Sequence, residues 1–155
     1  MVDWSRLYHT GVRVPVLEAA MEEMGSSLGL RWCTPRTSVQ SVWIPDGGVV
    51  EIPLRFTYST TGPVHLELLE GAPGSIWDGR DSPGIHHVGV WSDDVRADTE
   101  AMIDEGWRLL MSQTSPADGY GAFTYVQPPS GLVVEFVWSA IAPMFERWFA
   151  GGSLT

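Results

Sequence analysis

The sequence predicts an α+β fold in which the order of elements β-α-β-β-β occurs twice within one chain of 155 residues. The first observation behind this prediction is an internal repeat, because His9 and Gly11 align with His87 and Gly89 at an offset of 78 residues. The second is that each repeat begins with a short strand-like stretch, continues with a helical pattern and ends with several strand-like stretches. A chain of this length can bury a core of its own, so we expect a single domain over residues 1–155.

The first repeated unit covers about residues 5–70 and contains an amphipathic helix. Leu17, Met21 and Leu28 recur at helical spacing and lie on one apolar face. Glycines near the end of this pattern predict that the helix stops between residues 25 and 29. The strand-like stretches that follow cover residues 30–33, 38–44, 49–58 and 64–69.

The second unit covers about residues 84–139 and has the same order. Its helix is expected to begin after Asp93 or Asp94 as the N-cap and to end at Gly106. The residues expected to face inward from this helix are Val95, Met102 and Ile103. The strand-like stretches that follow cover residues 108–113, 122–127 and 132–138.

Two segments lie outside the repeated units. Residues 71–83 are rich in Gly, Pro and Asp, which indicates a linker between the two halves. Residues 140–150 have the pattern of a short amphipathic helix, whose large apolar residues are Met144, Phe145, Trp148 and Phe149. We expect this helix to cap the domain or to contact a partner subunit.

The composition excludes several classes of function. The net charge is −10 and all nine basic residues are arginine, so neither a nucleic acid nor a membrane is an expected partner. Without lysine, Schiff-base chemistry is excluded. No apolar run reaches the roughly 20 residues of a membrane-spanning helix, and residues 1–6 lack the apolar stretch of a signal peptide. Cys33 is the single cysteine, which excludes an internal disulfide, and we expect a cytoplasmic protein.

Strand alternation assigns the histidines to faces of the sheet. In the strand that opens each half, the valines share one face, and His9 and His87 lie on the opposite face. If the valines pack under the helices, both histidines point to the open concave side of the sheet. His86 shares the valine face and is therefore interpreted as a structural histidine.

Two glutamates complete a candidate metal site. Glu67 and Glu135 each lie between apolar residues in the last strand of a half, where an unpaired carboxylate is costly. Taken singly, each of the four residues is more simply explained as a polar group satisfied within the core. Their joint placement at equivalent positions of the two halves instead favours a site for a divalent ion, with Zn, Ni, Co, Fe and Mn all compatible with such ligands. The predicted ligands are His9, Glu67, His87 and Glu135.

At these residues the chain resembles the vicinal oxygen chelate superfamily, which includes glyoxalase I, methylmalonyl-CoA epimerase, extradiol dioxygenases and the bleomycin- and fosfomycin-resistance proteins. The resemblance extends from about residue 9 to residue 138 and is most specific in GIHHVGVWSDDV at 84–95, HLELLEG at 65–71 and PSGLVVEFV at 129–137. It implies two βαβββ modules paired into an open, cleft-shaped mixed sheet, with helices on the outer face and a metal at the centre. The ligand pattern of glyoxalase I falls on the four residues above. The epimerase branch typically has Gln at the second ligand, where this chain has Glu67.

The resemblance also implies a reaction. Substrates in this superfamily chelate the metal through oxygen, and a neighbouring carboxylate transfers a proton. Glu135 is then the expected base and Glu67 serves the opposite face, in an isomerase, an epimerase or a glyoxalase-type lyase that acts on a small molecule. Two alternatives stay open: an Fe(II) ring-cleaving dioxygenase, and a protein that sequesters a drug or metabolite without turnover. A homodimer is expected from the resemblance alone.

Aromatic residues and one further histidine are candidates for the substrate pocket. His65 shares the strand face of Glu67, and the aromatic candidates are Trp43, Tyr58, Trp91, Tyr125 and Trp138. Core packing is the alternative for each of them. Together they favour a bulky, largely apolar substrate. The absence of lysine weakens the case for a coenzyme A thioester, although several arginines remain.

Overall fold

The elements of the chain run β-α-β-β-β twice and end in a short helix. The computed structural model describes residues 2–155, so that Met1 lies outside the described residues. The first half contains β1 (Leu7–Arg13), α1 (Leu17–Leu28), β2 (Arg36–Ile44), β3 (Gly48–Tyr58) and β4 (His65–Gly71). The second half contains β5 (Gly84–Ser92), α2 (Val95–Asp104), β6 (Arg108–Ser112), β7 (Phe123–Gln127) and β8 (Val134–Trp138), and α3 (Ala142–Phe149) follows it.

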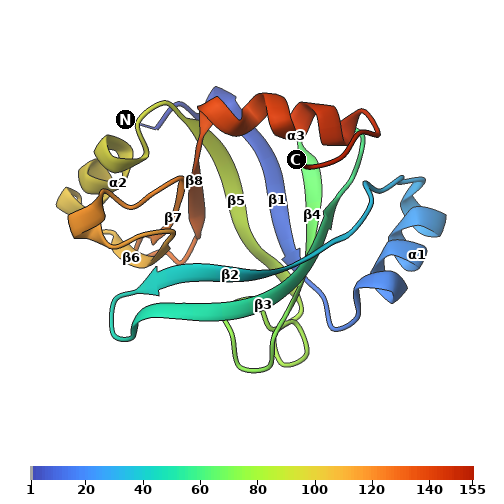
Figure 1. Cartoon of the computed structure of the whole chain (residues 1–155), viewed down its shortest axis with the longest axis horizontal. Coiled ribbons are helices and arrows are strands. Elements are labelled where there is room, and N and C mark those ends of the chain that lie inside the picture. The colour runs from blue at the N-terminus through green and yellow to red at the C-terminus, as the bar shows by residue number, and fades with distance from the viewer. Residues whose placement is uncertain (1) are drawn as a thin grey trace.

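The eight strands form a closed barrel in the order β1-β4-β3-β2-β6-β7-β8-β5, so the prediction of an open, cleft-shaped sheet is wrong. The barrel closes where β2 meets β6, through a single residue pair, Trp43 and Ser112. The helices lie outside: α1 and α2 flank the barrel on opposite sides, and α3 lies across one end (Figure 1). None of the helices among residues 2–155 is long and apolar enough to cross a membrane.

Two β-bulges in the central strands give a physical reason for the closure. The antiparallel pairing of β1 with β5 shifts register at Tyr8 and again at His86, and these two residues occupy equivalent places in the two halves. A bulge adds one residue to one strand, bends the strand and increases its twist. Because β1 and β5 lie opposite the seam in the barrel order, bends in these strands turn the outer strands β2 and β6 toward each other.

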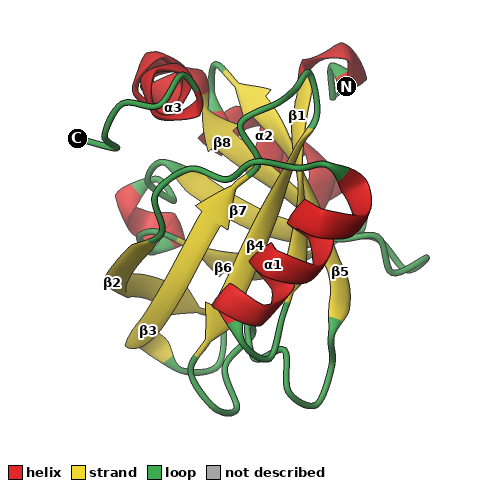
Figure 2. Ribbon diagram, turned by 90° about the vertical axis from the view of Figure 1, so that its right-hand side faces the viewer, coloured by secondary structure: helices red, strands yellow, loops and turns green. Residues whose placement is uncertain are grey.

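The helices shield the outer faces of the strands, as the valine pattern predicts. Figure 2 shows α1 lying across the outside of β4, where Leu17 packs against Leu68. The helix ends at Gly29, whose φ of 67° is the left-handed conformation that favours glycine at this position. On the other side, Asp94 caps α2 by accepting the Ala97 N–H at 2.9 Å.

Several details of the predicted elements differ from the structure. Leu28, expected on the apolar face of the first helix, is 63% exposed. Residues 30–33 do not form a strand, because only an isolated bridge joins Trp32 to Ser59. Ile103, which was expected to face inward from α2, is 36% exposed. The seam between β2 and β6 also depends on a contact between distant parts of the chain, which local periodicity does not register.

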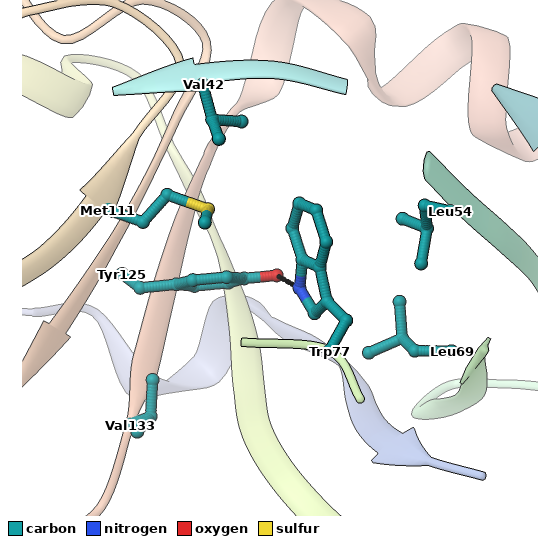
Figure 3. Packing of buried hydrophobic residues seen from close by; sticks show 7 residues of the cluster. All are labelled: Val42, Leu54, Leu69, Trp77, Met111, Tyr125 and Val133. Atoms are coloured by element: carbon teal, nitrogen blue, oxygen red, sulfur yellow. Dashed lines mark hydrogen bonds between the residues drawn. The ribbon is translucent and has the colours of Figure 1, made fainter. Parts of the chain in front are cut away.

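The segment between β4 and β5 plugs one end of the barrel. Trp77 on this segment is 2% exposed, and its indole N–H donates to the Tyr125 hydroxyl at 3.0 Å (Figure 3). Its ring packs among residues from several strands, namely Val42, Leu54, Leu69, Met111 and Val133. Figure 1 shows this segment at the end of the barrel opposite α3. The residues that were predicted to form a linker therefore also contribute to the core.

Replacing this plug tests its contribution to stability. We expect Trp77→Ala to lower the free energy of unfolding by about 3–5 kcal/mol, because a large buried ring is removed from a packed interior. Urea denaturation followed by circular dichroism measures the change. Trp138→Ala is the matched control, since Trp138 is 47% exposed and its loss should cost about 0.5 kcal/mol or less. Equal losses in the two variants would contradict the packing role of Trp77.

Candidate metal centre

The four predicted ligands lie in two rows that cross the central strands β4, β1, β5 and β8. In the first row, Gly11 of β1 pairs with Glu67 of β4 on one side and with His87 of β5 on the other. In the second row, Gly89 of β5 pairs with His9 of β1 and with Glu135 of β8. Each row therefore consists of one glutamate and one histidine with a glycine between them.

Each glycine makes room for a histidine ring from the neighbouring strand. A Cβ atom at Gly11 would lie 2.1 Å from Cε1 of His87, and a Cβ atom at Gly89 would lie 1.9 Å from Cε1 of His9. No side chain fits at these distances, because van der Waals contact between carbon atoms requires about 3.5–4.0 Å. The repeated His-x-Gly pattern thus packs a histidine ring over a glycine of the neighbouring strand in both halves.

The ligand atoms converge on one point. The Nε2 atoms of His9 and His87 lie 2.9 Å apart. Oε2 of Glu135 lies 3.0 Å from Nε2 of His9 and 3.3 Å from Nε2 of His87. Oε2 of Glu67 lies 3.4 Å from Nε2 of His9 and 3.2 Å from Nε2 of His87. Ligands at about 2.0–2.2 Å from a tetrahedral ion are separated by about 3.3–3.6 Å, so most of these distances approach the spacing of a coordination sphere.

The chemistry of these donors fits a divalent ion. Both histidines are fully buried, and Glu67 and Glu135 are 7% and 8% exposed. Oε2 of Glu67 is buried and makes no hydrogen bond, although it is aimed at both imidazoles. Two neutral imidazoles and two carboxylates carry a charge of −2, which a divalent cation would balance. His9, Glu67, His87 and Glu135 are therefore the residues that could hold such an ion.

The electrostatics without an ion follow from the same contacts. Burial disfavours charge on every member, but pairing between the imidazoles and the carboxylates outweighs it. The pKa of His87 is raised to about 9 and that of His9 is also raised. The pKa of Glu67 is lowered to about 2 and that of Glu135 is also lowered. The carboxylates thus favour protonation of the imidazoles, and a divalent ion bound in place of these protons would release them.

The bulged residues of the central strands lie beside the ligands. Nδ1 of His86 is 2.9 Å from Nδ1 of His87. Burial and the neighbouring charge of His87 lower the pKa of His86 to about 3, so that its ring stays neutral and can accept the His87 N–H. Alternation had placed His86 on the helix side, and the bulge explains the difference. Tyr8, at the equivalent position, has its ring centroid 4.3 Å from that of His9 and is a neighbour that the sequence analysis missed.

A cavity of about 210 Å³ adjoins the two glutamates of this cluster. Glu67 and Glu135 both contribute to its wall, and a tyrosine stands next to each of them in the sheet register, Tyr58 beside Glu67 and Tyr125 beside Glu135. Burial raises the pKa of both tyrosines well above the ordinary value. Apart from these groups the wall is mainly apolar, and part of it comes from the C-terminal segment through Ile141, Met144 and Phe145.

The remaining pocket candidates lie elsewhere. Trp43 borders a separate hollow that includes Ile103 of α2. Trp91 stacks on Tyr8 with 3.7 Å between the ring centroids, behind the cavity wall. His65 stacks on Phe149 of α3 at 3.8 Å. Trp138 is 47% exposed.

A barrel of two β-α-β-β-β units around a buried cluster of two histidines and two glutamates defines a candidate metal-binding protein. A family model described as the Glyoxalase/Bleomycin resistance protein/Dioxygenase superfamily matches residues 8–125. The chain therefore belongs to this superfamily, and the resemblance stated from the sequence is confirmed.

The proteins and solved structures that the chain is similar to include methylmalonyl-CoA epimerases. An ethylmalonyl-CoA/methylmalonyl-CoA epimerase from Cereibacter sphaeroides is 28% identical over 138 residues, which are 84% of this chain and 95% of that protein. A solved structure of methylmalonyl-CoA epimerase in complex with methylmalonyl-CoA and NH4+ matches with a TM-score of 0.58 and 24% identity, over 87% of this chain and 94% of that one. Methylmalonyl-CoA epimerase from Mycobacterium tuberculosis matches with a TM-score of 0.54 and 19% identity, over 86% and 87% of the respective chains. At these identities the solved structures show a shared fold.

Replacing Gly11 and Gly89, which lie between the two ligands of each row, tests the packing of the ligands. In Gly11→Ala and Gly89→Ala a methyl group displaces a histidine ring, and we expect Zn affinity to fall by about 100-fold or more. Competition with a chromogenic chelator measures this affinity. Thr10→Ala is the matched control, because Thr10 lies between two inward-facing positions of the same strand and should keep wild-type affinity. Unchanged affinity in both glycine variants would show that the rings need not lie where the structure has them.

The metal-free protein should lose stability as the pH rises. The folded-state pKa of His87, about 9, exceeds the ordinary value of 6.5, so its contribution is complete below pH 6.5 and is lost on raising the pH through about 9. We expect urea midpoints of the metal-free protein to fall across this window, with a loss on the order of a few kcal/mol. Zn-loaded protein should not show this loss, since its histidines are already deprotonated. His65→Ala should retain the effect, because the pKa of His65 is lowered instead. A flat profile for the metal-free protein would contradict the proposed pairing.

Proposed function

We propose that this protein is a divalent-metal-dependent isomerase or epimerase that moves a proton at the carbon next to a carbonyl group. The observation that carries this proposal is the placement of Glu67 and Glu135, which reach one apolar cavity from either side of the histidine pair. Membership of the superfamily and the likeness to methylmalonyl-CoA epimerases support it.

The chain can supply three parts of such a reaction. A bound divalent ion would provide the Lewis acidity that stabilises negative charge on a carbonyl oxygen. His9 and His87 would hold that ion in a fixed position, because their rings are packed against glycines of the neighbouring strands. Glu67 and Glu135 would accept and return the proton.

The two-row arrangement suits inversion at carbon in particular. An epimerase removes a proton from one face of a carbon atom and returns it to the other, and so needs a base on each side. Glu67 and Glu135 project from β4 and β8, which flank the central pair of strands, and each has a neutral tyrosine beside it. The carboxylates therefore have similar surroundings, which suits a pair of bases that serve opposite faces of one carbon atom. A glyoxalase-type lyase would use the same proton transfer on a different substrate.

Solvent exchange in the metal-loaded protein tests this proposal. We expect deuterium from solvent to appear at the carbon next to the carbonyl when 2-oxo compounds and acyl thioesters are incubated with the protein, as measured by mass spectrometry. Glu67→Gln and Glu135→Gln should each reduce the exchange rate by about 100-fold or more, since each removes a base. Glu70→Gln is the matched control, because Glu70 lies on the same strand as Glu67 but pairs with Arg55.

Three results would each give a different answer. Absence of bound metal in wild type after incubation with Zn, Ni, Co, Fe or Mn, measured by elemental analysis, would remove the basis of the proposal. Oxygen consumption with a catechol would indicate a ring-cleaving dioxygenase instead. Tight binding of a small molecule with neither exchange nor oxygen uptake would indicate a sequestering protein.

A further inference from the structure

We infer that the substrate of this site is a benzene-sized, largely apolar molecule with its oxygen atoms at one end, and that it carries no coenzyme A arm. The inference rests on the proposed function for the position of the reacting carbonyl. It departs from the likeness to coenzyme A thioester epimerases, and it follows from the size, the boundaries and the charge of the cavity.

The size of the cavity limits the ligand. An apolar cavity of about 150 Å³ holds one benzene molecule, and the cavity here measures about 210 Å³. The difference leaves room for a few further atoms, enough for a carbonyl and a neighbouring oxygen directed at Glu67 and Glu135. Pockets for drug-sized ligands are usually larger, at about 300–1,000 Å³.

The segment from Ile141 to Phe149, called the roof below, covers one side of the cavity and packs against the core. Residues after Trp138 lie outside both repeated units, and they place Phe145 in the cavity wall, with its ring centroid 5.5 Å from that of Tyr58. The next turn of α3 anchors the roof, because Trp148 is 1% exposed and packs against Cys33 and Tyr58. The tail is held as well, since Arg36 donates to the carbonyl of Leu154 at 3.0 Å. A long substrate arm therefore has no passage on this side.

The opposite end is closed by Trp77. Its indole ring fills the barrel below the cavity and is fixed by the hydrogen bond to Tyr125. The cavity opens instead toward the seam between β2 and β6, where its wall includes Gln40 and the exposed Gln113. Both side chains are uncharged amides. The neighbouring hollow that shares Gln113 also includes Arg96, which is paired with Glu100.

The charges of the chain disfavour a polyphosphate at this mouth. A coenzyme A arm carries several phosphate charges, whose binding needs free cationic side chains. The chain has a net charge of −10, and no arginine is among the described residues that line the cavity. Four of the nine arginines form ion pairs with carboxylates, and four others donate to neutral oxygen atoms of the protein. These are Arg6, Arg13, Arg36, Arg55, Arg80, Arg96, Arg108 and Arg147.

Hydroxamic acids of graded size test the inference through binding alone. Each chelates a metal through two oxygen atoms, one on the carbonyl carbon and one on the neighbouring nitrogen. The series therefore varies only the group that enters the cavity. We expect benzohydroxamic acid to bind the Zn-loaded, dialysed protein roughly tenfold or more tightly than either acetohydroxamic acid or 2-naphthohydroxamic acid, as measured by calorimetry. Methylmalonyl-CoA should not bind measurably.

Two variants in α3 distinguish the effect of cavity size on binding from general effects on the fold. Phe145→Ala enlarges the cavity, and we expect it to improve binding of 2-naphthohydroxamic acid by about tenfold or more. Phe149→Ala is the matched control, since Phe149 lies one turn further along α3 and stacks on His65 outside the cavity. It should leave the order of affinities unchanged.

The outcomes distinguish this inference from the proposed function. Equal affinity for all three hydroxamic acids, or tight binding of methylmalonyl-CoA, overturns the inferred substrate class. Deuterium exchange into an acyl-CoA thioester also overturns it, while the proposed proton transfer stands. If the hydroxamic acids bind in the expected order but no carbonyl compound exchanges its proton, the substrate class is supported and the proposed function is wrong.

Discussion

The structure depends on two imidazole rings that each occupy the space above a glycine of the neighbouring strand. His9 covers Gly89 and His87 covers Gly11, so the central pair of strands can form only in a register that brings both Nε2 atoms together. The positions of Glu67 and Glu135 then follow from the parallel pairing of β4 with β1 and of β8 with β5. One steric constraint thus sets the register and the position of the ligands.

Much of this arrangement can be predicted from the amino-acid sequence, because the repeat and the alternation of apolar and polar residues in the strands are both visible in it. The aligned His-x-Gly segments and the two glutamates in apolar strands were enough to select four residues that the structure brings together. The closure of the barrel was not predictable in this way. It depends on bulges at Tyr8 and His86, which shift alternation by one residue without a marker in the composition, and on a seam between strands that belong to different halves.

The glycine- and proline-rich segment between the halves shows a second limit of local patterns. Its composition indicates a connection, yet Trp77 within it fills the barrel interior. The C-terminal helix likewise has an amphipathic pattern that any capping helix would share, whereas its contribution to a cavity beside the carboxylates appears only in three dimensions. The central strands therefore carry the candidate metal ligands, and the two segments outside the repeats contribute to the wall of the cavity beside them.

The position of α3 after both repeated units also bears on how the protein is made. During synthesis the residues of α3 leave the ribosome after both β-α-β-β-β units, which can begin to fold first. During translation the histidines and glutamates can therefore meet while the space above them is still uncovered. An ion acquired at that stage would reach the histidines and glutamates before α3 covers them, so loading of the nascent chain and loading of the folded protein would follow different routes.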